Sequence, residues 1–196
     1  ECGASAIGFI FHSKSPRYIS PEQAKEIVMK IGRRVSFVGV FVDKPLDYVH
    51  TVSDMVNLDL IQLHGNESPE YCSLIKLPVL KAFRVDENFN SEIINKYKVH
   101  AFLFDTYKKG IAGGTGSVFN WELISNLQTD TPIIISGGLN ADNIIDSIKA
   151  VSPNSIDINS GAESVPGIKN KNKMMTLFDI LKNVEFSMNP FTISDT

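Results

Sequence analysis

Cysteine is scarce in this chain of 196 residues, which contains only Cys2 and Cys72. Two distant cysteines make neither a disulfide framework nor the paired spacing of a metal site. This scarcity is typical of a reducing compartment, so we expect a cytoplasmic location. Long apolar runs are also missing. The runs at 6–11 and 38–42 are far shorter than the roughly 18–20 residues of a membrane span, which gives no reason to expect a membrane partner.

Neither sign of charge is in large excess, since 19 Lys and Arg stand against 22 Asp and Glu for a net charge of −3. No basic run alternates with aromatic residues, so we expect no nucleic acid partner. The first residues show no secretory signal. The remaining composition, 43% hydrophobic and 21% charged, is ordinary for a soluble globular protein, and the length suits one large domain.

Strand-like and helix-like segments alternate along the chain. The predicted strands are mostly continuous apolar runs, as expected when helices cover both faces of a parallel sheet. They span residues 6–11, 35–42, 58–64, 79–85, 101–106, 132–136 and 155–158. Helices are predicted at 21–31, 46–56, 69–75, 89–97, 120–127, 141–150 and 171–183. The first of these follows the capping residue Ser20 and begins with a proline.

Seven strands, each followed by a helix, predict an α/β fold of the (β/α)8 TIM-barrel type. A doubly wound sheet is the alternative, but no Gly-x-Gly-x-x-Gly follows the first strand. An eight-fold barrel needs one more strand, and residues 1–5 have the pattern of a helix end. We therefore expect an N-terminally truncated barrel with seven visible βα units. Residues 1–183 would form this single domain, and 184–196 a poorly ordered C-terminal extension.

The ends of the last two predicted strands give the clearest functional signal. One strand runs into Ser-Gly-Gly (136–138) and the next into Asn-Ser-Gly (159–161). Glycine lets backbone N–H groups approach an anion, and we expect each end to open a helix whose dipole adds to the attraction. Phosphate-binding barrels hold their ligands at this place. The predicted phosphate site comprises Gly137, Gly138, Ser160 and Gly161; the alternative is that these glycines only make tight turns.

Three other strand ends carry side chains that could act on such a ligand. Arg17, in the loop after the first strand, could hold a carboxylate through two hydrogen bonds or could face solvent. His64 could take part in acid–base chemistry or have a structural role. Asp105 ends an apolar strand, where desolvation favours the protonated form of a general acid, but it could instead cap the following loop. The glycine-rich residues 108–116 could form a lid.

Short motifs spread over residues 3–182 occur in a fixed order. Through them the chain resembles phosphoribosylanthranilate isomerase, an enzyme of tryptophan biosynthesis. The motifs include Lys-Ser-Pro-Arg-Tyr (14–18), Gln-Leu-His-Gly (62–65), Asp-Thr (105–106), Gly-Gly-Thr-Gly (113–116), Phe-Asn-Trp (119–121), Ser-Gly-Gly-Leu-Asn (136–140) and Asp-Ile-Asn-Ser-Gly (157–161).

The resemblance implies an enzyme that converts N-(5-phosphoribosyl)anthranilate to 1-(2-carboxyphenylamino)-1-deoxyribulose 5-phosphate. The implied reaction is an acid–base Amadori rearrangement without a cofactor or metal. By position, Asp105 matches the general acid, Arg17 matches the clamp on the anthranilate carboxylate, and the two glycine ends match the phosphate site. The implied partner is a phosphorylated small-molecule substrate, and the protein would be a monomer or homodimer.

One part of the family pattern has no counterpart in these 196 residues. The family's general base is a cysteine in a Lys-(Ile/Val)-Cys-Gly motif that ends the first strand, whereas Cys2 precedes the first strand visible here. We expect Cys2 to be inert and Cys72 to lie in the core. A second hypothesis is therefore an impaired barrel that only binds a phosphorylated ligand. A third is a related phosphate-binding barrel such as indole-glycerol-phosphate synthase.

Overall fold

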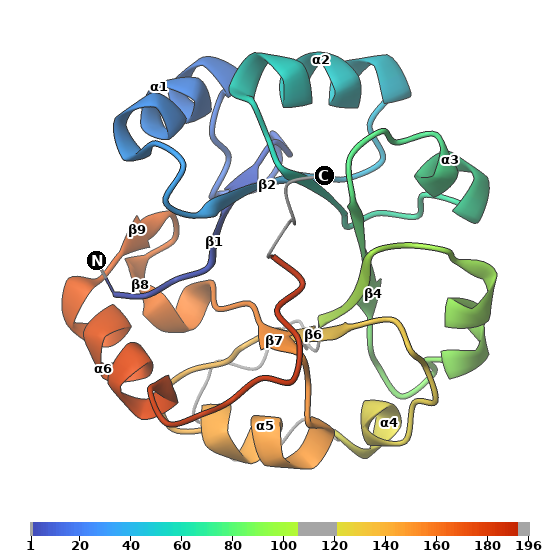
Figure 1. Cartoon of the computed structure of the whole chain (residues 1–196), viewed down its shortest axis with the longest axis vertical. Coiled ribbons are helices and arrows are strands. Elements are labelled where there is room, and N and C mark those ends of the chain that lie inside the picture. Colours follow the sequence, from blue (N-terminus) through green and yellow to red (C-terminus); the bar gives the residue numbers. More distant parts are fainter. Residues whose placement is uncertain (1, 106–120, 192–196) are drawn as a thin grey trace.

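A curled sheet of seven parallel strands forms the centre of the molecule, and the helices surround it (Figure 1). This arrangement comes from a computed structural model that describes residues 2–105 and 121–191. The strands pair in their sequence order, so each βα unit lies beside the next. They are β1 (Ala6–Ile10), β2 (Ser36–Phe41), β3 (Leu60–Leu63), β4 (Val79–Arg84), β5 (Ala101–Asp105), β6 (Ile133–Ser136) and β7 (Ser155–Ile156).

The helices confirm the predicted alternation. The α-helices are α1 (Pro21–Ile31), α2 (Leu46–Val56), α3 (Pro69–Ser73), α4 (Glu122–Ser125), α5 (Ile144–Val151) and α6 (Lys171–Leu181). Both bounds of α1 and of α2 are as predicted. Ser20 explains the start of α1, because its side chain accepts from the Gln23 backbone N–H while the Gln23 side chain accepts from the Ser20 N–H.

The largest differences from the predicted pattern lie in two places. Residues 89–97 were predicted as a helix, but only the 3-10 helix η1 (Ser91–Lys96) forms there. After β7 the chain makes a three-residue 3-10 turn, η2 (Ser160–Ala162), and then an unpredicted antiparallel hairpin of β8 (Glu163–Val165) and β9 (Ile168–Lys169). Gly167 allows the hairpin to turn, since its φ is +86°.

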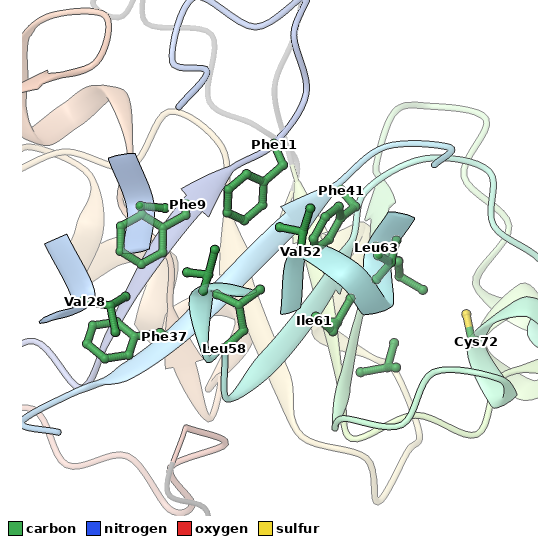
Figure 2. Close-up of a cluster of buried hydrophobic side chains, with 14 residues drawn as sticks. Phe9, Phe11, Val28, Phe37, Phe41, Val52, Leu58, Ile61, Leu63 and Cys72 are labelled. Atoms are coloured by element: carbon green, nitrogen blue, oxygen red, sulfur yellow. The ribbon is translucent and has the colours of Figure 1, made fainter. Parts of the chain in front are cut away.

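Aromatic residues fill the layer between the sheet and helices α1 and α2. Phe11 and Phe41 are fully buried, with ring centroids 5.2 Å apart, and both lie in the cluster drawn in Figure 2. A separate buried cluster contains Leu60, Leu103 and Ile134, which alternate along their strands with residues that face the helices. This alternation follows the two-residue period of a strand. It assigns Asp105, two residues after Leu103, to the same face of β5 as Leu103, at the carboxyl end of the strand.

The last described residues cross the amino ends of the strands. Ser36 Oγ donates to the Phe191 carbonyl at 2.6 Å, and a ring nitrogen of His100 lies 2.7 Å from the Pro190 carbonyl. Ser36 begins β2 and His100 directly precedes β5, so this segment lies at the sheet end opposite Asp105. The predicted domain division at residue 183 stays a prediction. No helix in the described part of the chain is long and apolar enough to span a membrane.

Candidate active site

The carboxyl ends of the parallel strands bring the predicted site residues to one end of the sheet. Asp105 is the last residue of β5 and pairs in register with Ser136, the last residue of β6. His64 directly follows β3, and Asp157 directly follows β7. Active sites of (β/α)8 barrels are built at this end, because loops of variable sequence follow each strand there.

His64 contacts Asp105 across the sheet. The distance from His64 Nε2 to Asp105 Oδ2 is 3.1 Å, and each side chain is about one-fifth exposed (19% and 20%). On the other side of the ring, Gln62 Nε2 lies 3.0 Å from His64 Nδ1. Because an amide NH2 group can only donate, Nδ1 accepts, and the ring proton is on Nε2, where it donates to Asp105. Of the two interpretations of His64, the structure favours a place in the site.

A second carboxyl group, Asp157, lies near Asp105 and was not among the predicted site residues. Ser136 Oγ donates to Asp157 Oδ2 at 3.1 Å. Burial raises the pKa of Asp157, and the nearby Asp105 charge adds to this increase, whereas the hydrogen bond from Ser136 acts in the lowering direction. Its position directly after a strand, within the Asp-Ile-Asn-Ser-Gly motif, is the sequence signal that could have identified it.

Arg17 lies in a bidentate ion pair with Glu163, the first residue of β8. Arg17 Nε is 3.0 Å from both carboxylate oxygens, and Nη2 is 2.7 Å from Oε2. The Glu163 side chain is 4% exposed and that of Arg17 is 24% exposed. Burial alone would raise the pKa of Glu163, but the hydrogen bonds from Arg17 and from the Gly167 N–H leave it below its usual range. The interpretation of Arg17 as a solvent-facing side chain is therefore wrong.

The two glycine-ended loops contact each other, as their places in the barrel order predicted. Gly137 and Gly138 have φ values of +93° and +65°, which favour glycine. At Gly161, an added Cβ would lie 1.9 Å from the Leu139 carbonyl oxygen, so only glycine fits this close approach.

The prediction that each glycine end opens a helix is wrong. Ser160 and Gly161 lie within η2, which is followed by the hairpin and not directly by a helix, and α5 begins six residues after Gly138. The cause is local: the hairpin of β8 and β9 occupies the place after β7. Anion binding at these loops would therefore depend on loop N–H groups rather than on a helix dipole.

Both cysteines lie away from this end of the sheet. Cys2 precedes β1, at the amino end of that strand, as predicted. Cys72 is buried in α3, where burial raises the pKa of its thiol to about 11. In the ranges 2–105 and 121–191 there is no group of three His, Cys, Asp or Glu residues suited to a metal ion. The predicted lid at 108–116 lies outside the described residues.

A family model described as N-(5′-phosphoribosyl)anthranilate (PRA) isomerase matches residues 1–180. The chain belongs to this family. The isomerase of Geobacter metallireducens is 42% identical over 174 residues, which are 89% of this chain and 86% of that protein. The isomerase of Citrifermentans bemidjiense is 41% identical over 184 residues, 94% of this chain and 89% of that protein.

Solved structures that are similar to this chain belong to the same family. The crystal structure of the isomerase from Thermus thermophilus has a TM-score of 0.81 and 32% identity, and covers 94% of this chain and 90% of its own. Another family member was solved with reduced 1-(o-carboxyphenylamino)-1-deoxyribulose 5-phosphate. It has a TM-score of 0.76 and 32% identity, and the match covers 92% of this chain and 89% of that chain. These matches confirm the predicted family and the barrel-type α/β fold.

The matches also identify the chain as an isomerase of tryptophan biosynthesis, as the motifs predicted. The hypothesis of a barrel that only binds a ligand is not favoured.

Proposed function

We propose that this chain binds N-(5′-phosphoribosyl)anthranilate and uses Asp105 as the general acid of its rearrangement, with Arg17 and the two glycine loops as the ligand's anchors. One observation carries the proposal. Asp105 ends β5 at the same end of the sheet as the glycine loops and the loop of Arg17, and it accepts a hydrogen bond from His64. The ligand solved with a relative combines a phenyl carboxylate, a sugar chain and a phosphate, and these three groups match the three features.

The acid step uses the contact between Asp105 and His64. A protonated Asp105 would donate to the furanose ring oxygen, and the ring would open to a Schiff base. Asp105 is then a carboxylate, and the Nε2–H of His64, 3.1 Å from Oδ2, stabilises it. Removal of the C2′ proton gives an enolamine, which tautomerises to the ketone. Neither cysteine lies at this end of the sheet, so the residues named here account for ring opening and binding and leave that proton without an assigned base.

The ends of the ligand are held by different chemistry. A guanidinium is planar and presents parallel N–H groups to a carboxylate, so Arg17 suits the anthranilate carboxylate. Backbone N–H groups in the loops at Gly138 and Gly161 suit the phosphate, because no Cβ keeps the anion away. A substrate anchored at both ends presents its sugar to the carboxyl between them.

We also propose that the enzyme is cytoplasmic and works as a monomer or homodimer. The composition supports the location, and the isomerase of Thermotoga maritima is described as dimeric. Size-exclusion chromatography with light scattering tests the oligomeric state directly.

Binding measurements with two ligands test the proposal. In the variant Arg17→Ala, we expect the affinity for the reduced carboxyphenylamino ligand to fall about 10–100-fold, since one charge-assisted contact is lost. The affinity for ribose 5-phosphate, which has no carboxylate, should change less than about twofold. Isothermal titration calorimetry gives both values. Equal losses for the two ligands would remove Arg17 from the proposed role.

A further inference from the structure

Glu163 connects several parts of the site through one buried side chain. Besides its bidentate pair with Arg17, its Oε1 accepts from the Gly167 backbone N–H at 3.2 Å and lies 3.5 Å from Lys169 Nζ. Its own backbone carbonyl accepts from Lys173 Nζ at 2.8 Å. The carboxylate is therefore fixed from the hairpin side before Arg17 contacts it.

Lys169 extends this connection to the predicted phosphate site. Its ammonium group donates to the Asn159 carbonyl oxygen at 2.9 Å and to Asn159 Oδ1 at 3.0 Å. Asn159 directly precedes Ser160 and Gly161 in the loop after β7. One chain of polar contacts thus runs from the loop of Arg17, through Glu163 and Lys169, to the phosphate loop.

We propose that Glu163 is a positioning residue that sets the orientation of the Arg17 guanidinium toward the carboxylate of the substrate. This inference rests on the proposed function of Arg17 as the carboxylate clamp. Glu163 would not touch the substrate, and its effect on binding of the substrate carboxylate would pass through Arg17.

The geometry explains why positioning is needed. An arginine side chain has many rotamers, and ordering them on binding costs free energy. Glu163 uses the Nε edge and one Nη2–H of Arg17, so the guanidinium plane is set before the substrate arrives and its remaining N–H groups point away from Glu163. A carboxylate bound there can meet the planar group in the orientation that bidentate pairing requires.

A competing effect has the opposite sign. The negative charge of Glu163 repels the substrate carboxylate on the other side of the guanidinium. We expect orientation to win, because Glu163 touches Arg17 at hydrogen-bond distance, whereas the two carboxylates would be separated by the width of the guanidinium. Whether replacing Glu163 weakens or strengthens binding of the substrate carboxylate decides between the two effects.

The experiment compares two ligands in each variant: the reduced carboxyphenylamino ligand and the same molecule without its carboxyl group. The ratio of their affinities measures what the carboxylate contributes. In Glu163→Gln, which keeps one acceptor but loses the bidentate pair, we expect this ratio to fall about tenfold. In Glu163→Asp, which keeps the charge but is one methylene shorter, the ratio should also fall. A ratio that is unchanged or raised in both variants overturns the inference.

Control variants separate positioning from a general loss of structure. Asp59→Asn disrupts another arginine–carboxylate pair, with Arg33, next to the amino end of β3, and should leave the ratio unchanged. Ribose 5-phosphate binding reports whether Glu163→Gln is folded. If that binding is lost, Glu163→Asp supplies the ratio.

A double variant distinguishes failure of this inference from failure of the proposed function. If Glu163 acts through Arg17, the ratio in Arg17→Ala/Glu163→Gln equals that in Arg17→Ala. If Arg17→Ala alone leaves the ratio unchanged, the clamp itself is refuted. If Arg17→Ala lowers the ratio but neither Glu163 variant does, the clamp stands and the positioning role of Glu163 is wrong.

Discussion

The ion pair between Lys81 and Glu67 is the most deeply buried charged contact described, and it gives a quantitative prediction about stability. Lys81 Nζ lies 2.7 Å from Glu67 Oε2, and each side chain is 2% exposed. Lys81 also donates to the Gly65 carbonyl at 2.7 Å, and Glu67 accepts from the backbone N–H groups of Asp43 and Gly65. Two loops at the carboxyl end of the sheet are therefore held by one pair.

The variant Lys81→Met removes the cation and leaves Glu67 buried without its partner. Breaking a buried pair in this way typically costs about 3–5 kcal/mol. The two backbone N–H groups that remain on Glu67 favour the lower part of that range. A protein of this size loses about 2–4 °C of Tm per kcal/mol, so the expected decrease is about 6–20 °C.

Thermal and urea unfolding followed by circular dichroism measure this cost. The double variant Lys81→Met/Glu67→Gln should recover part of the loss, because the uncompensated charge is gone. Arg33→Met is the matched control: it removes the cation of a pair in which Arg33 is 64% exposed, and such a pair is worth about 0–1 kcal/mol. A Lys81→Met variant no less stable than Arg33→Met would refute the reasoning.

Two further predictions concern the ends of β6 and β7. Because burial raises the pKa of Asp157, its charged form destabilises the fold as the pH rises through that pKa. Asp157→Asn should therefore raise the Tm at pH 7, and this gain in Tm should shrink as the pH falls toward about 4. A gain in Tm that does not depend on pH would contradict this cause. Gly161→Ala should weaken ribose 5-phosphate binding about tenfold or more, because the added Cβ meets the Leu139 carbonyl oxygen. The control Gly32→Ala is also strained, at φ +68°, but has open space around it and should leave this binding unchanged. Equal ribose 5-phosphate affinities in the two variants would exclude the contact between the two loops from phosphate recognition.

The sequence predicted those features that depend on short stretches of chain. The start of α1 follows from the cap at Ser20, and the position of Asp105 at the end of β5 follows from the apolar run that precedes it. The meeting of the loops at Gly138 and Gly161 follows from strand order alone, because consecutive parallel strands are neighbours. Local pattern was enough in each case.

Features that depend on distant residues were not predicted. Glu163 lies 146 positions from Arg17, and nothing near either residue indicates that they pair. The hairpin that carries Glu163 is formed by strands of only two and three residues, too short to show a period. Asp157 was not predicted as a site residue for another reason. Its position at the end of a strand resembles that of Asp105, but its place in the site depends on burial and on the contact with Ser136, which only the folded chain reveals.

A crystal structure of this chain with reduced 1-(o-carboxyphenylamino)-1-deoxyribulose 5-phosphate tests the central claim most directly. We expect the phosphate beside Gly138 and Gly161, the carboxylate on Arg17, and the Asp105 carboxyl facing the sugar chain between them. A phosphate bound elsewhere, or an Asp105 carboxyl turned away from the ligand, would contradict the account.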